Sequence, residues 1–438
     1  MLWQTGRLST VSSTVADLEI ATYGIGQVVE GTQTGRDADT LVVSASQLAV
    51  GAGEPALAEA TVEVVRPGEP VRVSNVLDAV LPSVKADDPS ATFPGLLGSA
   101  PDLSWAQLVG ADGGAGLGRT TRLSDIAVLS VCDWFAAGYV GPDELPDSFV
   151  DMDGPGAQRS PFGSISNVVV RFVPAIGAPV AEVDLAIRRE TLRVARDLAA
   201  AAIGQQPDEI TRYPWPLDAA GSVPSIVLIV QVASEGPLTD TFFRGRAMTD
   251  LEPTAFDPRA LFDGVLTNGA YDWPAVRNVT AAYQDSALLR ELYSAHGERL
   301  NFGGFILAPG YLDTAEQKLR SAVASARLAK ELGADGVICT TFSSGNSHTD
   351  TMLTVQACER AGLATTAFVC ETNGGLTDHV AEADCLISTG NEDDLVEPWT
   401  PERTVGGGRE RAGEPVPTWA YLGACSQMGE TRWTAVPA

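Results

Sequence analysis

The sequence predicts an α/β protein in which a β-rich N-terminal region precedes a doubly wound, mainly parallel α/β region. Two observations support this fold class. Up to about residue 165, short runs of alternating apolar and polar residues, rich in Val and Thr, end at Gly and Pro turn signals. Beyond residue 280, apolar strand-like segments alternate with helical stretches of about 10 to 20 residues, as in the βαβ units of a parallel sheet.

Shifts in composition divide the chain into four predicted regions. A β-rich domain is expected over 1–165, an α/β segment over 166–280, a Rossmann-like parallel α/β domain over 281–405 and a loop-rich tail over 406–438. The length of 438 residues allows two or three domains of about 150 residues, each with its own core.

The first elements follow from local patterns. Residues 61–65 alternate as a half-buried strand does and stop at the Pro-Gly turn of 66–69. A strand is predicted over 168–173, and apolar residues at helical spacing predict an amphipathic helix over 180–203. The apolar run at 225–232 predicts a buried strand, because it is far shorter than the ~20 residues that span a bilayer.

The third region contains four further helix–strand pairs. Helices are predicted over 282–299, 314–332, 349–361 and 378–382, and the strands that follow them over 302–307, 335–340, 364–370 and 385–388. Right-handed crossovers between such strands place helices on both faces of one sheet.

Composition limits the classes of partner and the compartment. Asp and Glu number 56 against 29 Lys and Arg, which gives a formal net charge of -27. Because phosphates and anionic membranes attract Lys and Arg, this charge disfavours nucleic acid and membranes as partners. The N-terminus lacks the segments of a secretory signal, and the six cysteines follow no CxxC spacing, so a cytoplasmic protein with free, mostly buried thiols is expected.

The candidate ligand site lies where three predicted strands end in polar, Gly-containing loops at 340–350, 371–375 and 389–393. In an open parallel sheet, ligands bind beyond the carboxyl ends of the strands, and a following helix N-terminus favours an anion such as a carboxylate. The predicted substrate-binding residues are Thr340, Ser343, Ser344, Asn346, His348, Glu371, Asn373 and Asn391.

A purely structural role for the same residues is the alternative. Ser, Thr, Asn and Asp favour turns and helix N-caps, with Ser347 or Thr349 as the cap, and His348 is then an ordinary loop histidine. The dinucleotide, P-loop and GxSxG motifs are absent. The acidic runs that start at Asp151 and Glu392 are interpreted as solvated loop acids, so no metal is expected.

Several longer motifs resemble one family in the same order along the chain. They are 64–73 (Val-Val-Arg-Pro-Gly-Glu-Pro-Val-Arg-Val), 92–95 (Thr-Phe-Pro-Gly), 159–162 with 167–169, 237–245, 262–264 (Phe-Asp-Gly) and 292–302. The chain resembles the substrate-specific proprotein subunit of component B of the clostridial glycine, sarcosine and betaine reductases, and more distantly the D-proline reductase proprotein.

The resemblance implies covalent chemistry shared between two subunits. In that family the proprotein cleaves itself at an Asn-Cys step after the Asp-Gly motif, and the cysteine becomes a pyruvoyl group that captures the substrate amine. A cysteine or selenocysteine of a partner subunit then attacks the α-carbon and expels the amine.

This sequence departs from the family at the decisive position. An ungapped match places Tyr271 where the cysteine belongs, and no cysteine occurs between Cys132 and Cys339. No serine lies between 263 and 272, and Thr267 would give a different keto acyl group. Self-cleavage is therefore not expected, and no pyruvoyl cofactor is predicted.

The leading functional hypothesis is a substrate-binding subunit of a component-B-like oxidoreductase complex in amino acid metabolism. It would act in substitution or reductive cleavage at the α-carbon of a small amino acid or carboxylate, with a Cys or Sec nucleophile supplied by a partner subunit. The alternatives are a non-catalytic structural or regulatory partner of that subunit, and a subunit recruited to C–S bond chemistry. Cys339, one residue before the 340–350 loop, is expected to pack in the core.

Overall fold

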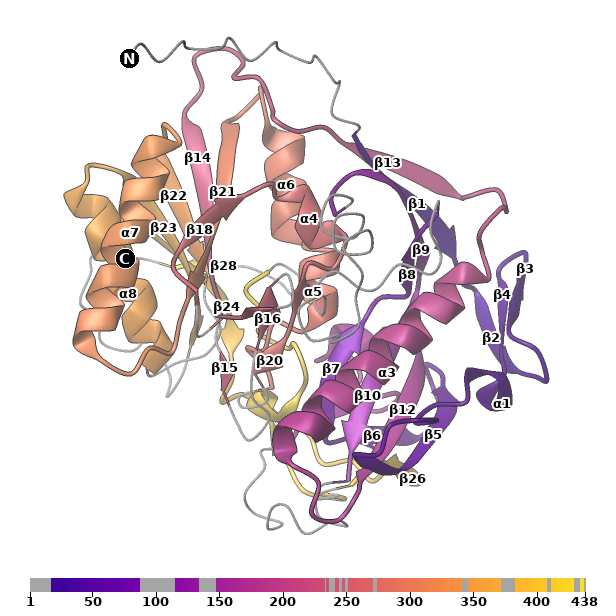
Figure 1. The fold of residues 1–438 in the computed structure, drawn as a ribbon. Coiled ribbons are helices and arrows are strands. Elements are labelled where there is room, and N and C mark those ends of the chain that lie inside the picture. The colour runs from indigo at the N-terminus through magenta and orange to yellow at the C-terminus, as the bar shows by residue number, and fades with distance from the viewer. Residues whose placement is uncertain are drawn as a thin grey trace, which may run out of the picture.

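The computed structural model describes residues 17–86, 115–133, 147–232, 234–235, 241–243, 246–248, 251–270, 274–340, 346–371, 383–407, 411–428 and 434–436. Strands and one long helix from the first half of the chain form one part, and a large sheet with helices on both faces forms the other (Figure 1). The predicted fold class is confirmed. No helix of the described residues is long and apolar enough to cross a membrane.

Two four-stranded sheets build most of the N-terminal part. The first has the order β13 (Glu209–Tyr213), β1 (Leu18–Gly24), β9 (Gly118–Ser124), β8 (Ser83–Lys85), and the second has the order β5 (Leu57–Val65), β12 (Ser166–Pro174), β10 (Ile126–Cys132), β7 (Val76–Val80). Helix α3 (Val180–Ala200) packs against the second sheet. Strand β10 is buried on both faces, which is why it reads as a continuous apolar run instead of alternating.

Two three-stranded sheets complete this part. They have the orders β11 (Phe149–Asp151), β6 (Val71–Ser74), β26 (Arg403–Val405) and β2 (Gln27–Glu30), β4 (Thr40–Val43), β3 (Gly35–Asp37). Strand β26 pairs in parallel with β6, so a segment close to the C-terminus joins the N-terminal part. Asp151 in β11 is fully buried against Arg72, so its interpretation as a solvated loop acid is wrong.

Within the described residues, the largest sheet has seven strands. Their order is β18 (Thr254–Phe256), β21 (Asn301–Pro309), β14 (Ser225–Val232), β22 (Gly336–Thr340), β23 (Ala364–Glu371), β24 (Cys385–Asn391), β28 (Thr434–Val436). The five central strands are parallel, and the two edge strands are antiparallel. In chain order the parallel strands run 2-1-3-4-5, a doubly wound arrangement with β14 as the first strand.

Alternating side chains of β14 face two different helix layers. Val227 and Ile229 pack with α7 (Ala315–Glu331) and α8 (Asn346–Arg360), whereas Leu228 and Val230 pack with α4 (Arg259–Phe262), α5 (Thr280–Gln284) and α6 (Ala287–Ala295). Figure 1 shows α7 and α8 on one side of the strands and α4 to α6 on the other. Each face of the sheet is therefore covered, as an all-apolar parallel sheet requires.

The helix predicted over 282–299 is two helices. Ser286 interrupts the pattern because its side chain accepts the backbone N–H of Leu289 and so forms the N-cap of α6. The helices predicted over 180–203 and 314–332 are confirmed as α3 and α7, and a capping box of Thr314 and Gln317 begins α7. The helix predicted over 378–382 lies outside the described residues.

Candidate functional site at the carboxyl edge of the main sheet

The carboxyl ends of the five parallel strands lie at one edge of the main sheet, called the carboxyl edge below. The strands β14, β21, β22, β23 and β24 end there at Val232, Pro309, Thr340, Glu371 and Asn391. The chain passes from β14 to β21 on one side and returns across β14 to β22, so the direction of winding switches between β14 and β22. Ligands of doubly wound sheets bind at such a switch point. The three strands that precede the predicted polar loops, β22, β23 and β24, are parallel neighbours in this sheet.

Asn346 and His348 lie on the α7–α8 side of the carboxyl edge. Helix α8 begins at Asn346, so Ser347 and Thr349 lie within its first turn, and neither is the cap that the sequence suggested. His348 is a buried helical residue instead of a loop histidine. The Asn346 side-chain amide lies 3.5 Å from the Leu312 carbonyl, a weak hydrogen bond at most.

A buried ion pair fixes the first turn of α8 to α7. Lys318 Nζ lies 2.8 Å from Asp350 Oδ1 and 3.4 Å from the Asn346 carbonyl oxygen. Burial raises the pKa of Asp350, although the Lys318 ammonium opposes that shift. Sequence reasoning missed this pair. The available signal was that Lys318 is one of three lysines in a chain that otherwise uses arginine.

Thr340 faces the opposite side of the sheet, where the C-terminal tail crosses the carboxyl edge. Its hydroxyl lies 3.7 Å from Met428 Sδ. The Met428 carbonyl accepts hydrogen bonds of 3.1 Å from the Leu288 N–H and the Ser286 hydroxyl, which ties the tail to the start of α6. Residues 425–428 are almost completely buried, so the tail predicted to be loop-rich packs into the site.

Glu371 and Asn391 end neighbouring strands, and each already has a protein partner. Glu371 Oε1 accepts the hydroxyl of Ser388, and Asn391 Oδ1 accepts the backbone N–H of Asp393 at 3.0 Å. The Asn391 contact is an Asx-turn, which matches the structural alternative for this residue. The other predicted site residues, Ser343, Ser344 and Asn373, lie outside the described residues.

Glu392 departs furthest from the expectation of a solvated loop acid. It is 3% exposed, whereas the next residue, Asp393, is exposed. Its backbone N–H donates to the Glu371 carbonyl at 3.1 Å, and its carbonyl accepts the Trp419 N–H at 2.8 Å. Burial, with the negative charge of Asp393, raises the pKa of Glu392 to about 7. The sequence held no signal for this, because burial here depends on the distant tail.

Two thiols lie beside Glu392. Cys370 Sγ is 3.4 Å from the Gly390 carbonyl oxygen, and Cys425 Sγ is 3.2 Å from the place that a Cβ on Gly390 would take. A hydrogen bond with the Cys425 thiol, burial and the charge of Glu392 raise the pKa of Cys370. Thiols held protonated in this way are poor nucleophiles.

The cysteine predictions are confirmed with one exception. All six cysteines are free and five are buried, while Cys385 is half-buried. Cys339 is 1% exposed and packs in the core between the sheet and α8, as expected. Among the described residues, no group of three His, Cys, Asp or Glu side chains could hold a metal ion.

The Asp-Gly motif at 263–264 is anchored to the N-terminal strands. Asp263 is 7% exposed, and its carboxylate accepts hydrogen bonds from Lys85 Nζ, the Gly116 N–H at 2.6 Å and the Thr120 hydroxyl at 2.5 Å. Three donors satisfy most of the hydrogen-bonding capacity of this carboxylate. Asp263 therefore has a structural role at the start of the segment that leads to residue 271.

A second buried cluster, called the Asp78 clamp below, joins the two ends of the same segment, Asn268 and Thr280. Asp78 accepts the Thr280 N–H at 2.9 Å and the Thr280 hydroxyl at 2.5 Å, and Thr280 Oγ1 accepts the Asn268 N–H at 3.0 Å. Arg188 donates to the Asn268 carbonyl. Burial raises the pKa of Asp78 to about 6, although the hydrogen bonds from Thr280 oppose that shift. A cavity of about 10 Å³ lies beside Asp78, Arg188 and Thr267.

Position 271 lies outside the described residues, but its neighbours on both sides reach the carboxyl edge. Ala270 pairs with Glu235, three residues beyond the end of β14. The Ala275 carbonyl accepts the Cys425 N–H at 2.7 Å. The motif segment and the sheet edge, which sequence reasoning treated separately, therefore meet at one place.

Comparison with known proteins identifies the family of the chain. The sequence model of the family described as glycine/sarcosine/betaine reductase component B subunits matches residues 16–415. The chain is 28% identical over 340 residues to the glycine reductase complex component B subunits alpha and beta of Acetoanaerobium sticklandii, covering 75% of this chain and 74% of the relative.

Two relatives come from Peptoclostridium acidaminophilum. The sarcosine reductase complex component B subunit alpha is 28% identical over 340 residues (75% of this chain, 74% of the relative), and the betaine reductase complex component B subunit alpha is 26% identical over 401 residues (87% and 85%). No solved structure is significantly similar. The motif resemblance is confirmed, and the chain belongs to the family of glycine/sarcosine/betaine reductase component B subunits.

Proposed function

We propose that the chain is the substrate-binding subunit of a component-B-type reductase complex and that it works without a pyruvoyl group. The substrate is a small amino acid or carboxylate derivative bound at the carboxyl edge. The reaction is substitution or reductive cleavage at its α-carbon, with a Cys or Sec nucleophile supplied by a second subunit. This chain contributes by holding the α-carbon in line for that attack, because orientation alone lowers a barrier substantially.

One observation carries the proposal. The segment that the family uses for its reactive group reaches the switch point of the doubly wound sheet, where ligands of such folds bind. The thiols support the need for a second subunit, because Cys339, Cys370 and Cys425 are buried, and a hydrogen bond with a neighbouring thiol together with burial raises the pKa of Cys339 and Cys370.

Reconstitution tests the need for a partner. The purified chain alone is expected to show no turnover of glycine, sarcosine or betaine, and turnover is expected when a nucleophile-bearing component B subunit is added. That subunit should co-purify with the chain through an interface of at least ~1,000 Å². Turnover by the isolated chain that Cys339→Ser abolishes would contradict the proposal. A stable but inactive complex with every substrate would favour a structural or regulatory role instead.

Intact-mass spectrometry tests the absence of a pyruvoyl group. With Tyr271 at the matching position there is no thiol to drive an acyl shift, so one species at the full 45.8 kDa is expected. Treatment with borohydride should leave that mass unchanged. Tyr271→Cys is the matched variant, because it restores the residue type that the family cleaves. Two fragments from the wild type that separate near residue 270 would overturn this part of the proposal.

A further inference from the structure

The Glu392 carboxyl group has a hydrogen-bonding oxygen that the described protein does not use. Glu392 is 3% exposed, and its Oε2 makes no hydrogen bond to any described residue. A buried carboxyl oxygen without a partner costs free energy, so native proteins keep few of them, and those that remain call for an explanation such as strain, a catalytic role or a bound water, ion or ligand. This atom lies at the carboxyl edge, just after the last residue of β24.

In the described part of the chain, the titratable neighbours of Glu392 are acids and thiols. They are Asp393 on its own turn and Cys370 at the end of β23, with Cys425 behind Cys370. Glu371 contacts Glu392 through its backbone carbonyl, and its carboxylate accepts the Ser388 hydroxyl. No cation among the described residues acts on the Glu392 charge. A cationic ligand would supply the counter-charge that makes the ionised carboxylate favourable.

We propose that Glu392 binds the ammonium group of the substrate, which donates an N–H hydrogen bond to Oε2. This inference rests on the proposed function and deepens it by naming the substrate class: amino acids with a primary or secondary ammonium. A quaternary nitrogen carries no N–H and leaves Oε2 unpaired, and a site built around a hydrogen bond strongly rejects an analogue that lacks it.

The assignment predicts proton release on binding. The carboxyl pKa of about 7 means that most Glu392 side chains are protonated at about pH 6. A bound ammonium favours the ionised carboxylate and lowers that pKa, so each binding event expels nearly one proton at about pH 6 and few at about pH 8. Affinity for an ammonium substrate therefore rises as the pH increases through about 7.

Calorimetric titration of the full chain with glycine and with trimethylglycine (betaine) tests the inference. Proton release is counted by repeating each titration in two buffers of different ionisation enthalpy. For the wild type, glycine should bind more tightly than trimethylglycine and release the expected proton. Glu392→Gln should bind glycine about ten- to a hundredfold more weakly and release no proton. Asp394→Asn, which alters an exposed acid that does not act on the Glu392 pKa, is the matched control and should resemble the wild type.

The outcomes separate this inference from the proposed function. If Glu392→Gln keeps the wild-type affinity and proton count for glycine, the Glu392 assignment is wrong and the proposed function stands. If Glu392→Gln weakens the binding of glycine and of trimethylglycine equally, Glu392 does not contact the nitrogen. If the wild type binds neither ligand, the proposed function fails and this inference fails with it. The wild-type proton count needs no variant, so poor folding of Glu392→Gln does not remove the test.

Discussion

Replacing Asp78 by alanine is expected to lower the free energy of unfolding by about 2 to 4 kcal/mol near neutral pH. The change removes the acceptor of the Thr280 N–H and hydroxyl, and stranded buried donors cost about 1 to 3 kcal/mol each. Because the Thr280 hydroxyl oxygen also accepts the Asn268 N–H, the two ends of the loop between these residues should become more mobile. Urea denaturation measures the loss, and glycine affinity measures the effect on the site.

The Asp78→Asn variant tests the role of charge. The pKa of Asp78 is about 6 in the folded protein and 3.8 ordinarily, so the folded state binds more protons between these values. The stabilisation that comes from this proton uptake is therefore present below about pH 4 and is lost as the pH rises through about 6. The free energy of unfolding falls by up to about 3 kcal/mol over this range. Asp78→Asn should lack this decline.

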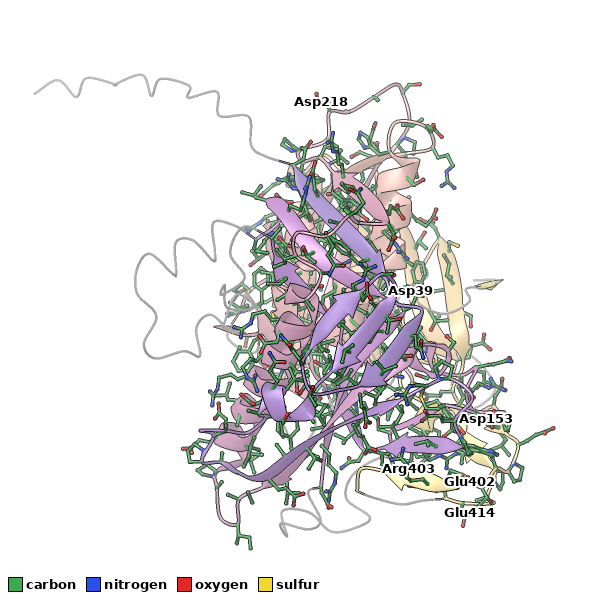
Figure 2. The ribbon with its side chains drawn as sticks, turned by 90° about the vertical axis from the view of Figure 1, so that its right-hand side faces the viewer. Asp39, Asp153, Asp218, Glu402, Arg403 and Glu414 are labelled. Carbon is green, nitrogen blue, oxygen red and sulfur yellow. The ribbon has the colours of Figure 1, made fainter. Side chains whose placement is uncertain are left out.

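An exposed acid serves as the control for Asp78. Asp39 lies at the surface of the N-terminal part (Figure 2), and its replacement by alanine or asparagine should change stability by less than about 0.5 kcal/mol. If Asp78→Ala proves as mild as Asp39→Ala, or if Asp78→Asn keeps the wild-type pH dependence, the Asp78 clamp does not hold the segment.

Breaking the Arg72–Asp151 pair is expected to have the largest effect on stability. Arg72 donates to both Asp151 oxygens, at 2.6 and 2.8 Å, and both side chains are at most 1% exposed. The Tyr421 hydroxyl donates to Asp151 at 3.1 Å, and the Arg72 guanidinium lies 4.5 Å from the Phe149 ring centroid. Asp151→Ala removes the carboxylate that neutralises a buried guanidinium and should cost about 3 to 5 kcal/mol in thermal or urea unfolding.

A double variant and a surface pair complete this test. Arg72→Met with Asp151→Leu replaces both charges by apolar side chains and should recover most of the loss, because such replacements are often neutral. Arg403 pairs with Glu63 at the surface, where Figure 2 labels Arg403, and Glu63→Gln should cost less than about 1 kcal/mol. A loss of that small size for Asp151→Ala would contradict the assigned role of the buried pair.

Local sequence patterns determined much of the α/β fold. The apolar run of β14, the helical periodicity of α7 and the helix–strand alternation after residue 300 each reflect interactions within a few residues, and each was predicted within a few residues of its observed bounds. The split of the predicted 282–299 helix was missed, because a single capping serine, Ser286, overrides the continuous apolar periodicity. The parallel direction of the strands was predicted from the length of the connections between them.

The sequence by itself also determined the family and the absence of a cysteine at position 271, since both depend only on residue identity. Only the tertiary structure decided which acids are buried and which segments meet. Asp151 and Glu392 looked like solvated loop acids, but the tail, through Tyr421 and Trp419, contacts both. Contacts between residues hundreds of positions apart leave no local periodicity. Burial, and the pKa shifts that burial causes, therefore appear only once the chain is folded.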